Sequence, residues 1–582
     1  PNAYFGRGSQ RETRDTINGD RLLENRNGVF YNASAKANIY ASKIGYGLGI
    51  SISDINNDGY PDIYVGNDFF EDDYLYLNQK NGTFKEIHSS AGVLGHTSHF
   101  SMGNDIADIN NDGLSDIISV DMLPEDPYTL KTSGAEYNYP IFSNNLKQGY
   151  KPQFMQNTLH INSGAATFTE TAFLSNIAST EWSWSPLLAD FDNDGHTDLY
   201  ITNGIIGDTN DMDFINFISN DNIQKRLGKN MTDGELPFIQ EMPSKKTENY
   251  FFKNNRNATF TNTSSDWIAP KTSFSNGSSY ADLDNDGDLD LIVNNVNEAA
   301  YILENKTQQI DTTRNYLKVA FNGPHHNKFG IGAKVEIYST QGKQYFENYT
   351  TRGFLSSVAP ELFIGLDTVS IIDSLRVIWP DGKTQKLNTI ISNQKITLDY
   401  KNASGNFYDS IQITPITRFI NDTLIPFRHN ENATVEFSRN PLVPYSSTNL
   451  SKAIRIGDIN NDGLEDFITL GAKSQITSLQ LQTTLGKFTQ KELPNDRTHA
   501  IAEDIDAIIF DANGDELNDL IIVSGGNEIQ TGSALQPRLY LNTQEGLKQV
   551  ENAFDNIFVN ASTVRAVDLD QDGDLDLSIT SD

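Results

Sequence analysis

The chain of 582 residues contains no cysteine, which excludes disulfides, thiolate metal sites and cysteine nucleophiles. It has no apolar run near the ~20 residues that a membrane-spanning helix requires. Basic residues are scarce: 44 Lys and Arg stand against 77 Asp and Glu, which gives a formal net charge of −33. This imbalance argues against binding to nucleic acid or to bare anionic lipid, because both require clustered positive charge. With 37% hydrophobic residues, the chain can nevertheless form folded cores.

A nine-residue pattern, D-x-[DN]-x-D-G-x-x-D, occurs seven times and organises the chain. We number its copies loop 1 (54–62), loop 2 (108–116), loop 3 (190–198), loop 4 (282–290), loop 5 (458–466), loop 6 (511–519) and loop 7 (568–576). Loop 6 is degenerate, because Glu516 replaces the glycine at position 6. The sequence is therefore that of a repeat protein.

Short β-branched or aromatic runs precede and follow each loop, as in 49–53 and 63–65, and they predict strands. Hairpins are expected further on, at 74–86, 159–168 and 250–260, the first around an Asn-Gly turn. Each repeat therefore has about four strands, as in one propeller blade. A similar hairpin at 21–30 has no loop before it, and it resembles the tail of a preceding blade.

The predicted domains are a blade tail and first strand (1–50), four blades (51–308), another β domain (309–402), and a linker with three further blades (403–582). Wider loop spacings imply insertions at about 122–153 and 204–249, the second with a short helix from Asp213. The chain begins without Met at Pro1 and stops within an apolar run, so we expect it to be part of a longer protein.

The loops have the chemistry of calcium sites. Positions 1, 3, 5 and 9 supply side-chain oxygens, position 7 can supply its carbonyl, and Ca²⁺ takes six to eight such ligands. Mg²⁺ suits such a site less well, because it retains its waters. An EF-hand is excluded, because position 12 is never acidic and the flanking runs predict strands. The alternative is that some loops are Asx-turns without an ion.

We expect about six to seven Ca²⁺ sites, and the number depends on whether loop 6 binds metal with Glu516 at position 6. The predicted ligands are Asp54, Asn56, Asp58, Tyr60, Asp62, Asp108, Asn110, Asp112, Leu114, Asp116, Asp190, Asp192, Asp194, His196, Asp198, Asp282, Asp284, Asp286, Asp288, Asp290, Asp458, Asn460, Asp462, Leu464, Asp466, Asp511, Asn513, Asp515, Asp519, Asp568, Asp570, Asp572, Asp574 and Asp576.

These loops resemble the FG-GAP/VCBS repeats of calcium-loop β-propellers, which integrin α-subunits also contain. Residues 327–335, 352–358 and 375–382 are similar to the ASPIC/UnbV domain, and the combination resembles large surface proteins of Bacteroidetes. The resemblance implies an all-β fold with Ca²⁺ loops between the first two strands of each blade. It also implies that three more repeats precede loop 1 and complete a seven-bladed propeller near residue 308, and that loops 5 to 7 begin a second propeller.

The sequence predicts a non-catalytic, calcium-binding surface protein that binds a protein or glycan partner. Two alternatives stay open: an accessory scaffold of an outer-membrane transport or secretion complex built around a β-barrel, and a polysaccharide-active enzyme. No catalytic motif or further cofactor site is present. The expected location is extracytoplasmic, at the cell surface or outer membrane of a Gram-negative bacterium, through a lipid anchor or secretion signal outside this chain.

Three smaller features have less specific interpretations. Trp182 and Trp184 alternate before loop 3, which favours core packing of one of them over a sugar-stacking platform. His325 and His326 have no third ligand at a suitable spacing, so a metal site there is not expected. Arg352 matches the ASPIC/UnbV motif and is interpreted as a structural residue.

Overall fold

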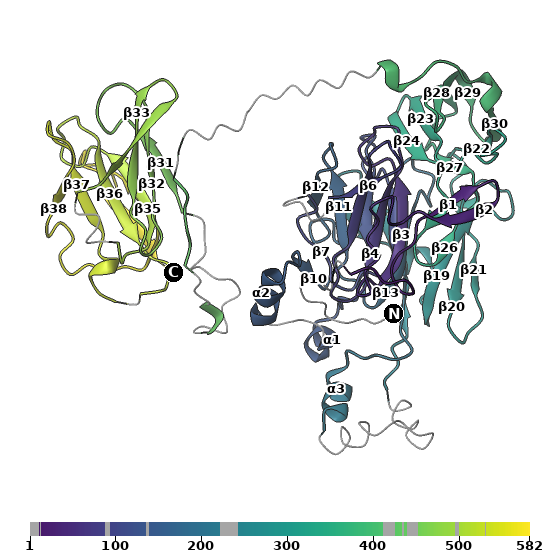
Figure 1. Ribbon diagram of the computed structural model, residues 1–582, viewed down its shortest axis with the longest axis horizontal. Coiled ribbons are helices and arrows are strands. Elements are labelled where there is room, and N and C mark those ends of the chain that lie inside the picture. The colour runs from purple at the N-terminus through teal and green to yellow at the C-terminus, as the bar shows by residue number, and fades with distance from the viewer. Residues whose placement is uncertain are drawn as a thin grey trace. The chain divides into compact units, whose positions relative to one another are not determined.

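A computed structural model describes residues 11, 13–87, 93–134, 139–220, 242–410, 425, 427–432, 436–438, 452–494, 500–529 and 531–581 (Figure 1). The chain divides into two compact units, Pro1–Ile413 and Thr414–Asp582. Parts of the predicted segments 1–50, 204–249 and 403–582 lie outside the described residues. Antiparallel sheets dominate both units, as the predicted all-β fold requires. None of the helices that the structure describes is long and apolar enough to cross a bilayer.

The first unit contains four blade-like sheets. Blade 1 consists of β3 (Gly47–Ser53), β4 (Asp62–Asn67), β5 (Tyr74–Asn78) and β6 (Phe84–Glu86). Blade 2 consists of β8 (Asn104–Ala107), β9 (Asp116–Ser119), β11 (Thr158–Asn162) and β12 (Phe168–Glu170). Blade 3 consists of β13 (Ser183–Ala189), β14 (Asp198–Asn203), β16 (Tyr250–Asn254) and β17 (Phe260–Asn262). Blade 4 consists of β19 (Ser275–Ala281), β20 (Asp290–Asn295) and β21 (Tyr301–Leu303).

Loops 1 to 4 each connect the first and second strands of their blade, and the predicted flanking strands and hairpins are confirmed. The expectation of four strands per repeat is wrong for blade 4. After β21 the chain enters the short helix α7 (Thr307–Ile310) and continues into the next domain. The hairpin predicted at 21–30 is present as β1 (Leu23–Arg26) and β2 (Val29–Asn32).

Neighbouring blades pack through apolar side chains, and in blades 1 to 3 these side chains cover both faces of the sheet. Tyr64 and Leu75 of blade 1 contribute to one core with Ile117 and Phe168 of blade 2. A second core lies between blades 2 and 3, and a third lies between blades 3 and 4. Burial on both faces explains why the strands are almost continuously apolar, as in Leu-Tyr-Ile of β14.

A separate β domain follows α7 and has two sheets around its own core. One sheet has the order β27-β22-β30, from β22 (Tyr316–Asn322), β27 (Leu362–Gly365) and β30 (Gln394–Asp399). The other has the order β24-β23-β28-β29, from β23 (Lys334–Ser339), β24 (Gly342–Glu347), β28 (Ile371–Ile378) and β29 (Thr384–Ile391). A small hairpin, β25 (Thr351–Arg352) and β26 (Ser356–Ser357), extends from this domain and contacts β3, β8 and β19 of the blades.

The insertions contain helices. The predicted helix near Asp213 is confirmed as α3 (Met212–Ile218). The sequence analysis missed α1 (Pro127–Thr132) and α2 (Tyr139–Lys147) in the insertion at 122–153. The Asp126-Pro127 pair could have identified α1, because Asp126 caps the helix and proline occupies its first turn. The remaining short elements that the structure describes in this unit are β7 (Thr97–Ser98), β10 (Gln153–Phe154), β15 (Thr247–Glu248), β18 (Thr272–Ser273), α6 (Ser264–Trp267), η3 (Tyr400–Asn402) and η4 (Tyr408–Ser410).

The second unit repeats the blade design. Blade 5 consists of β31 (Ile454–Gly457), β32 (Asp466–Thr469), β33 (Ser478–Thr484) and β34 (Lys487–Glu492). Blade 6 consists of β35 (Asp504–Phe510), β36 (Asp519–Ser524), β37 (Arg538–Leu541) and β38 (Lys548–Val550). Blade 7 is described as the pair β39 (Ala561–Val567) and β40 (Asp576–Ser581). Among the described residues, this unit also contains the 3-10 turns η5 (Glu436–Ser438) and η6 (Ser533–Leu535). Loops 5 to 7 again connect first and second strands.

Candidate metal-binding loops

All seven loops share one hydrogen-bonded frame. The position-1 carboxylate accepts the backbone N–H of position 6 at 2.6–3.1 Å in every loop. The position-9 carboxylate accepts the N–H of position 2 at 2.8–3.2 Å. The position-5 carboxylate accepts the N–H of position 7 at 2.8–3.4 Å. The structure thus brings the predicted ligands of each loop into a single turn.

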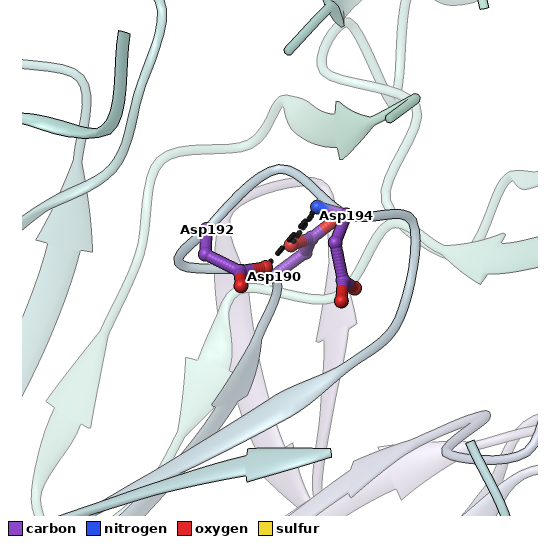
Figure 2. Close-up of side chains that lie close together, drawn as sticks. All are labelled: Asp190, Asp192 and Asp194. Atoms are coloured by element: carbon purple, nitrogen blue, oxygen red, sulfur yellow. Dashed lines mark hydrogen bonds between the residues drawn. The ribbon is translucent and has the colours of Figure 1, made fainter. Parts of the chain in front are cut away.

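Loop 3 shows the arrangement in detail. Asp190 and Asp192 each accept a hydrogen bond from the backbone N–H of Asp194, at 3.0 and 3.2 Å (Figure 2). One oxygen from each of these three carboxylates lies within 4.8 Å of the others. Loops 4 and 7 bring the oxygens of positions 1, 3 and 5 equally close. This geometry matches the size of a hard cation, which could contact all three side chains together.

The degenerate loop 6 retains the same frame. Glu516 adopts a left-handed backbone conformation, with φ of 67°, and its N–H reaches Asp511 at 2.7 Å. The glycines at position 6 of the other loops have φ between 83° and 101°. A glutamate in this region has a steric cost that glycine does not have. The replacement therefore strains loop 6 without removing any of its predicted ligands.

Several of these carboxylates are buried, and among the described residues no positive charge nearby fully compensates them. Burial raises the pKa of Asp62 to about 8 and the pKa of Asp108 and of Asp116 to about 7, with neighbouring carboxylates adding to the shift. Burial and the adjacent aspartates likewise raise the pKa of Asp190 well above its ordinary value. Such groups are costly to ionise alone, whereas a divalent cation would stabilise their charged form. The donor set therefore fits Ca²⁺.

Three loops receive an ammonium group from elsewhere in the first unit. Lys334 pairs with Asp54 of loop 1, and Lys318 pairs with Asp282 of loop 4. Lys253 pairs with Asp192 and, at 3.0 Å, with Asp194 of loop 3. Among the described residues, no ion pair reaches the ligands of loops 2, 5, 6 and 7. These lysines were missed in the sequence, because none of them lies within a loop.

The sequence analysis also missed a set of asparagines that link neighbouring loops. Asn162 donates its backbone N–H to Asp116 of its own loop at 2.8 Å. Its side-chain amide reaches Ile55 O of the preceding loop at 3.0 Å and Ser115 O at 3.1 Å. Asn254, Asn305 and Asn542 make the corresponding contacts to the preceding loops. The signal is present in the sequence, since an asparagine stands at the end of the third strand of each of these blades or within two residues after it.

A second link uses the asparagine at position 4. Asn57, Asn111 and Asn193 all have φ near 55–60°, as in a left-handed turn. Their side-chain amides donate to the glycine carbonyl of the next loop at 2.9–3.1 Å. Both kinds of link make loops 1 to 4 one continuous hydrogen-bonded row rather than four isolated sites.

The structure also shows the surroundings of the three smaller features of the sequence, the tryptophan pair, Arg352 and the histidine pair. Trp182 and Trp184 pack against the core between blades 2 and 3, so the core-packing interpretation is confirmed. Arg352 pairs with buried Asp105 at 2.9 Å and donates to Ile106 O at 2.6 Å, which confirms its structural role. The rings of His325 and His326 contact one another, and neither belongs to a described cluster of metal-ligating groups.

The fold and the loops define a β-rich repeat protein of the propeller-blade class. The FG-GAP-like repeat model matches residues 54–119 and 242–293, and the ASPIC and UnbV model matches residues 323–405. The chain therefore contains FG-GAP-like repeats and an ASPIC and UnbV domain, as the sequence analysis predicted. The matched ASPIC and UnbV segment includes most of the β domain.

Two curated relatives are both named cartilage acidic protein 1. The chain is 26% identical to the Xenopus tropicalis protein over 369 residues, which cover 61% of this chain and 45% of that protein. It is 25% identical to the Mus musculus protein over 350 residues, which cover 59% of this chain and 43% of that protein. The alignments thus span less than half the length of these relatives.

Among solved structures, an Agrocybe aegerita lectin that recognises non-reducing terminal N-acetylglucosamine aligns with 88% of this chain and 83% of its own. The identity is 13% and the TM-score is 0.23. A score this low does not establish a shared architecture.

Proposed function

We propose that the loops bind Ca²⁺ and that the protein is a non-catalytic, calcium-stabilised binding protein. The observation that carries the proposal is the shared frame, which gathers the predicted ligands of all seven loops into a single turn. Several of the enclosed carboxylates are buried without enough positive charge. When bound, Ca²⁺ would supply that charge and hold the two strands on either side of each loop together.

The main effect of bound calcium would be to stabilise the folded protein. An independent site at ~100 times its Kd adds about 2.7 kcal/mol to the free energy of unfolding. Extracellular calcium modules often have Kd values near ~10⁻⁴–10⁻³ M, so such sites fill outside cells and stay largely empty in the cytosol. We therefore place the protein in an extracytoplasmic setting, at a bacterial cell surface or outer membrane.

The partner would be a protein or a glycan that binds to inserted segments rather than to the loops. The loop carboxylates are held by backbone N–H groups, which suits structural ligands rather than acid–base catalysts. The insertion helices α1, α2 and α3 contribute only one buried side chain, Phe214, so most of their surface is available to a partner. Function then depends on such grafted segments and not on the fold itself.

The calcium proposal can be tested in loop 2, which has no lysine partner among the described residues. Asp108→Asn combined with Asp112→Asn should remove most of the calcium-dependent rise in melting temperature that this loop contributes. The four tryptophans all lie in the first unit, so their fluorescence follows its unfolding within the whole chain. Asp373→Asn, at an exposed position of β28, is the matched control. An unchanged difference between calcium and chelator would reject a site in loop 2.

The binding role requires a separate experiment. The tagged chain should capture one stoichiometric partner from native outer membranes in Ca²⁺ and lose it in chelator. Co-purification of a β-barrel transporter would favour the scaffold alternative. Turnover on a glycan panel that is lost after substitution outside the loops would contradict the non-catalytic proposal.

A further inference from the structure

The β domain lies directly on the row of loops in the first unit. Glu347 accepts the backbone N–H of Asp54 in loop 1 at 3.1 Å. Gln344 donates to Gly195 O of loop 3 at 3.1 Å, and the N–H of Asp367 donates to Asn193 O of the same loop at 2.8 Å. Loops 1 and 3 are thus in direct hydrogen-bond contact with a domain that belongs to no blade.

The same domain inserts two buried lysines into the loops. The Lys334 side chain, on β23, is 8% exposed, and the side chain of its partner Asp54 is 2% exposed. The Lys318 side chain, on β22, is 11% exposed, and the side chain of Asp282 is again 2% exposed. Lys253 in loop 3 differs, because it comes from the blade itself and is 31% exposed. Lys253 can therefore turn into solvent, whereas the two β-domain lysines are enclosed.

Each enclosed lysine contacts the position-1 aspartate, which is a predicted calcium ligand. In both pairs the contacted atom is Oδ2, and in loop 4 the other oxygen, Oδ1 of Asp282, is buried without a hydrogen-bond partner. A divalent cation in the same turn would lie next to the ammonium group, and like charges at such short range repel strongly. The ammonium group and the cation therefore compete for the same carboxylate.

We propose that Lys334 and Lys318 are built-in competitors of Ca²⁺ at loops 1 and 4. In the docked arrangement these lysines serve as the counter-charge, so loops 1 and 4 bind Ca²⁺ more weakly than the lysine-free loops. Filling them displaces the lysines and loosens the β domain from the blades, because the same lysines attach that domain to the loop row. By reciprocity, docking of the β domain must weaken calcium binding by the same factor. The inference rests on the proposed calcium binding and deepens it.

The test compares the whole chain with its Lys334→Met, Lys318→Met double variant, using CaCl₂ titrations in a calorimeter. Wild-type protein should show a tight class of sites and a weaker class of two. In the variant these two sites should bind at least about tenfold more tightly, in line with typical coupling between linked sites. Lys395→Met, which removes an exposed lysine of the same domain paired with Glu361, should leave both classes unchanged.

Hydrogen exchange of the wild-type chain gives a second readout that does not depend on the variant folding. Saturation of the weak class should increase exchange in the hairpin at 351–357, which contacts the blades. Equal site affinities in wild type and double variant would overturn the proposal, and so would calcium-independent exchange of the hairpin. Absence of any calcium binding, including at loop 2, would instead refute the proposed function.

Discussion

Arg352 offers a direct test of how the β domain is attached to the blades. Arg352 lies in the β25–β26 hairpin, and its guanidinium donates to Asp105 at 2.9 Å. The Asp105 side chain is only 1% exposed. Asp105 also accepts the backbone N–H groups of Leu188 and Ile106, at 2.8 and 2.9 Å. Arg352→Met would keep much of the side-chain volume and leave a buried carboxylate without its counter-charge.

The expected cost follows from that burial. Removing one partner of a buried pair typically destabilises a protein by about 3–5 kcal/mol, because the remaining charge stays desolvated. A domain is stable by only about 5–15 kcal/mol, so the first unit should be severely weakened. Burial already raises the pKa of Asp105 against the opposing effect of Arg352. Without the arginine that pKa should rise further, and the loss should be smaller at low pH, where Asp105 is neutral.

The assay is urea unfolding of the whole chain, followed by tryptophan fluorescence at pH 5 and pH 8. Trp184 is well placed to report, because its ring lies 5.1 Å from that of Phe354 in the same hairpin. A double-mutant cycle with Asp105→Asn should recover most of the loss, since both charges are then absent. If Arg352→Met costs the same in the wild-type chain and in the Asp105→Asn variant, the ion pair does not hold the hairpin.

Two further predictions concern the blades. Asn162→Ala should lower the free energy of unfolding of the first unit by about 2–3 kcal/mol, because two buried carbonyls lose their donor. Asn78→Ala loses only exposed bonds from its side chain, to Pro61 O and from the Lys80 N–H, and should cost about 1 kcal/mol or less in the same urea experiment. Equal losses for the two variants would contradict a role of Asn162 in linking loops. In chelator, stability should fall as pH rises from about 4 to 7, because burial raises the pKa of Asp68 to about 7, and the folded state therefore keeps a proton that the unfolded state loses. Asp68→Asn should reduce this dependence, because the other buried carboxylates still contribute to it, and an unchanged slope in urea unfolding at pH 5 and 7 would exclude Asp68 as a source.

Much of the fold could be predicted because each repeat contains short sequence signals that determine its local structure. The Asp-rich loops mark where two strands meet, and the hairpin at 74–86 carries its own Asn-Gly turn. Such signals depend on a few neighbouring residues, so they do not require knowledge of the tertiary fold. The three-stranded blade 4 was missed for the opposite reason. After β21 the chain leaves the blade through α7 and enters the β domain, and this change becomes visible only after the β domain is placed.

In the metal-binding loops, too, contacts between residues close in sequence could be predicted and contacts between distant residues could not. Residues within nine positions of one another were identified together, because one turn suffices to bring them into contact. Lys334 lies 280 residues from Asp54 in sequence, and no local pattern connects them. Lys318 and Glu347 were missed for the same reason. The asparagines at 162, 254 and 305 form an intermediate case, since they recur at a fixed place in each blade but their bond to the preceding loop requires the packing of two blades.

These contacts change how the loops should be viewed. An isolated loop would bind or release a cation with little effect beyond its own two strands. Here Asn162 joins loops 1 and 2 through Ile55 O and Ser115 O, and Asn57 adds a second bond between the same loops. The β domain hydrogen-bonds to loops 1 and 3, and it places its two enclosed lysines at the ends of the row, in loops 1 and 4. A cation that orders an inner loop therefore acts on its neighbours through these bonds, whereas a cation at either end must first displace an enclosed lysine of the β domain. The row thus combines supporting links between loops with competition at its two ends.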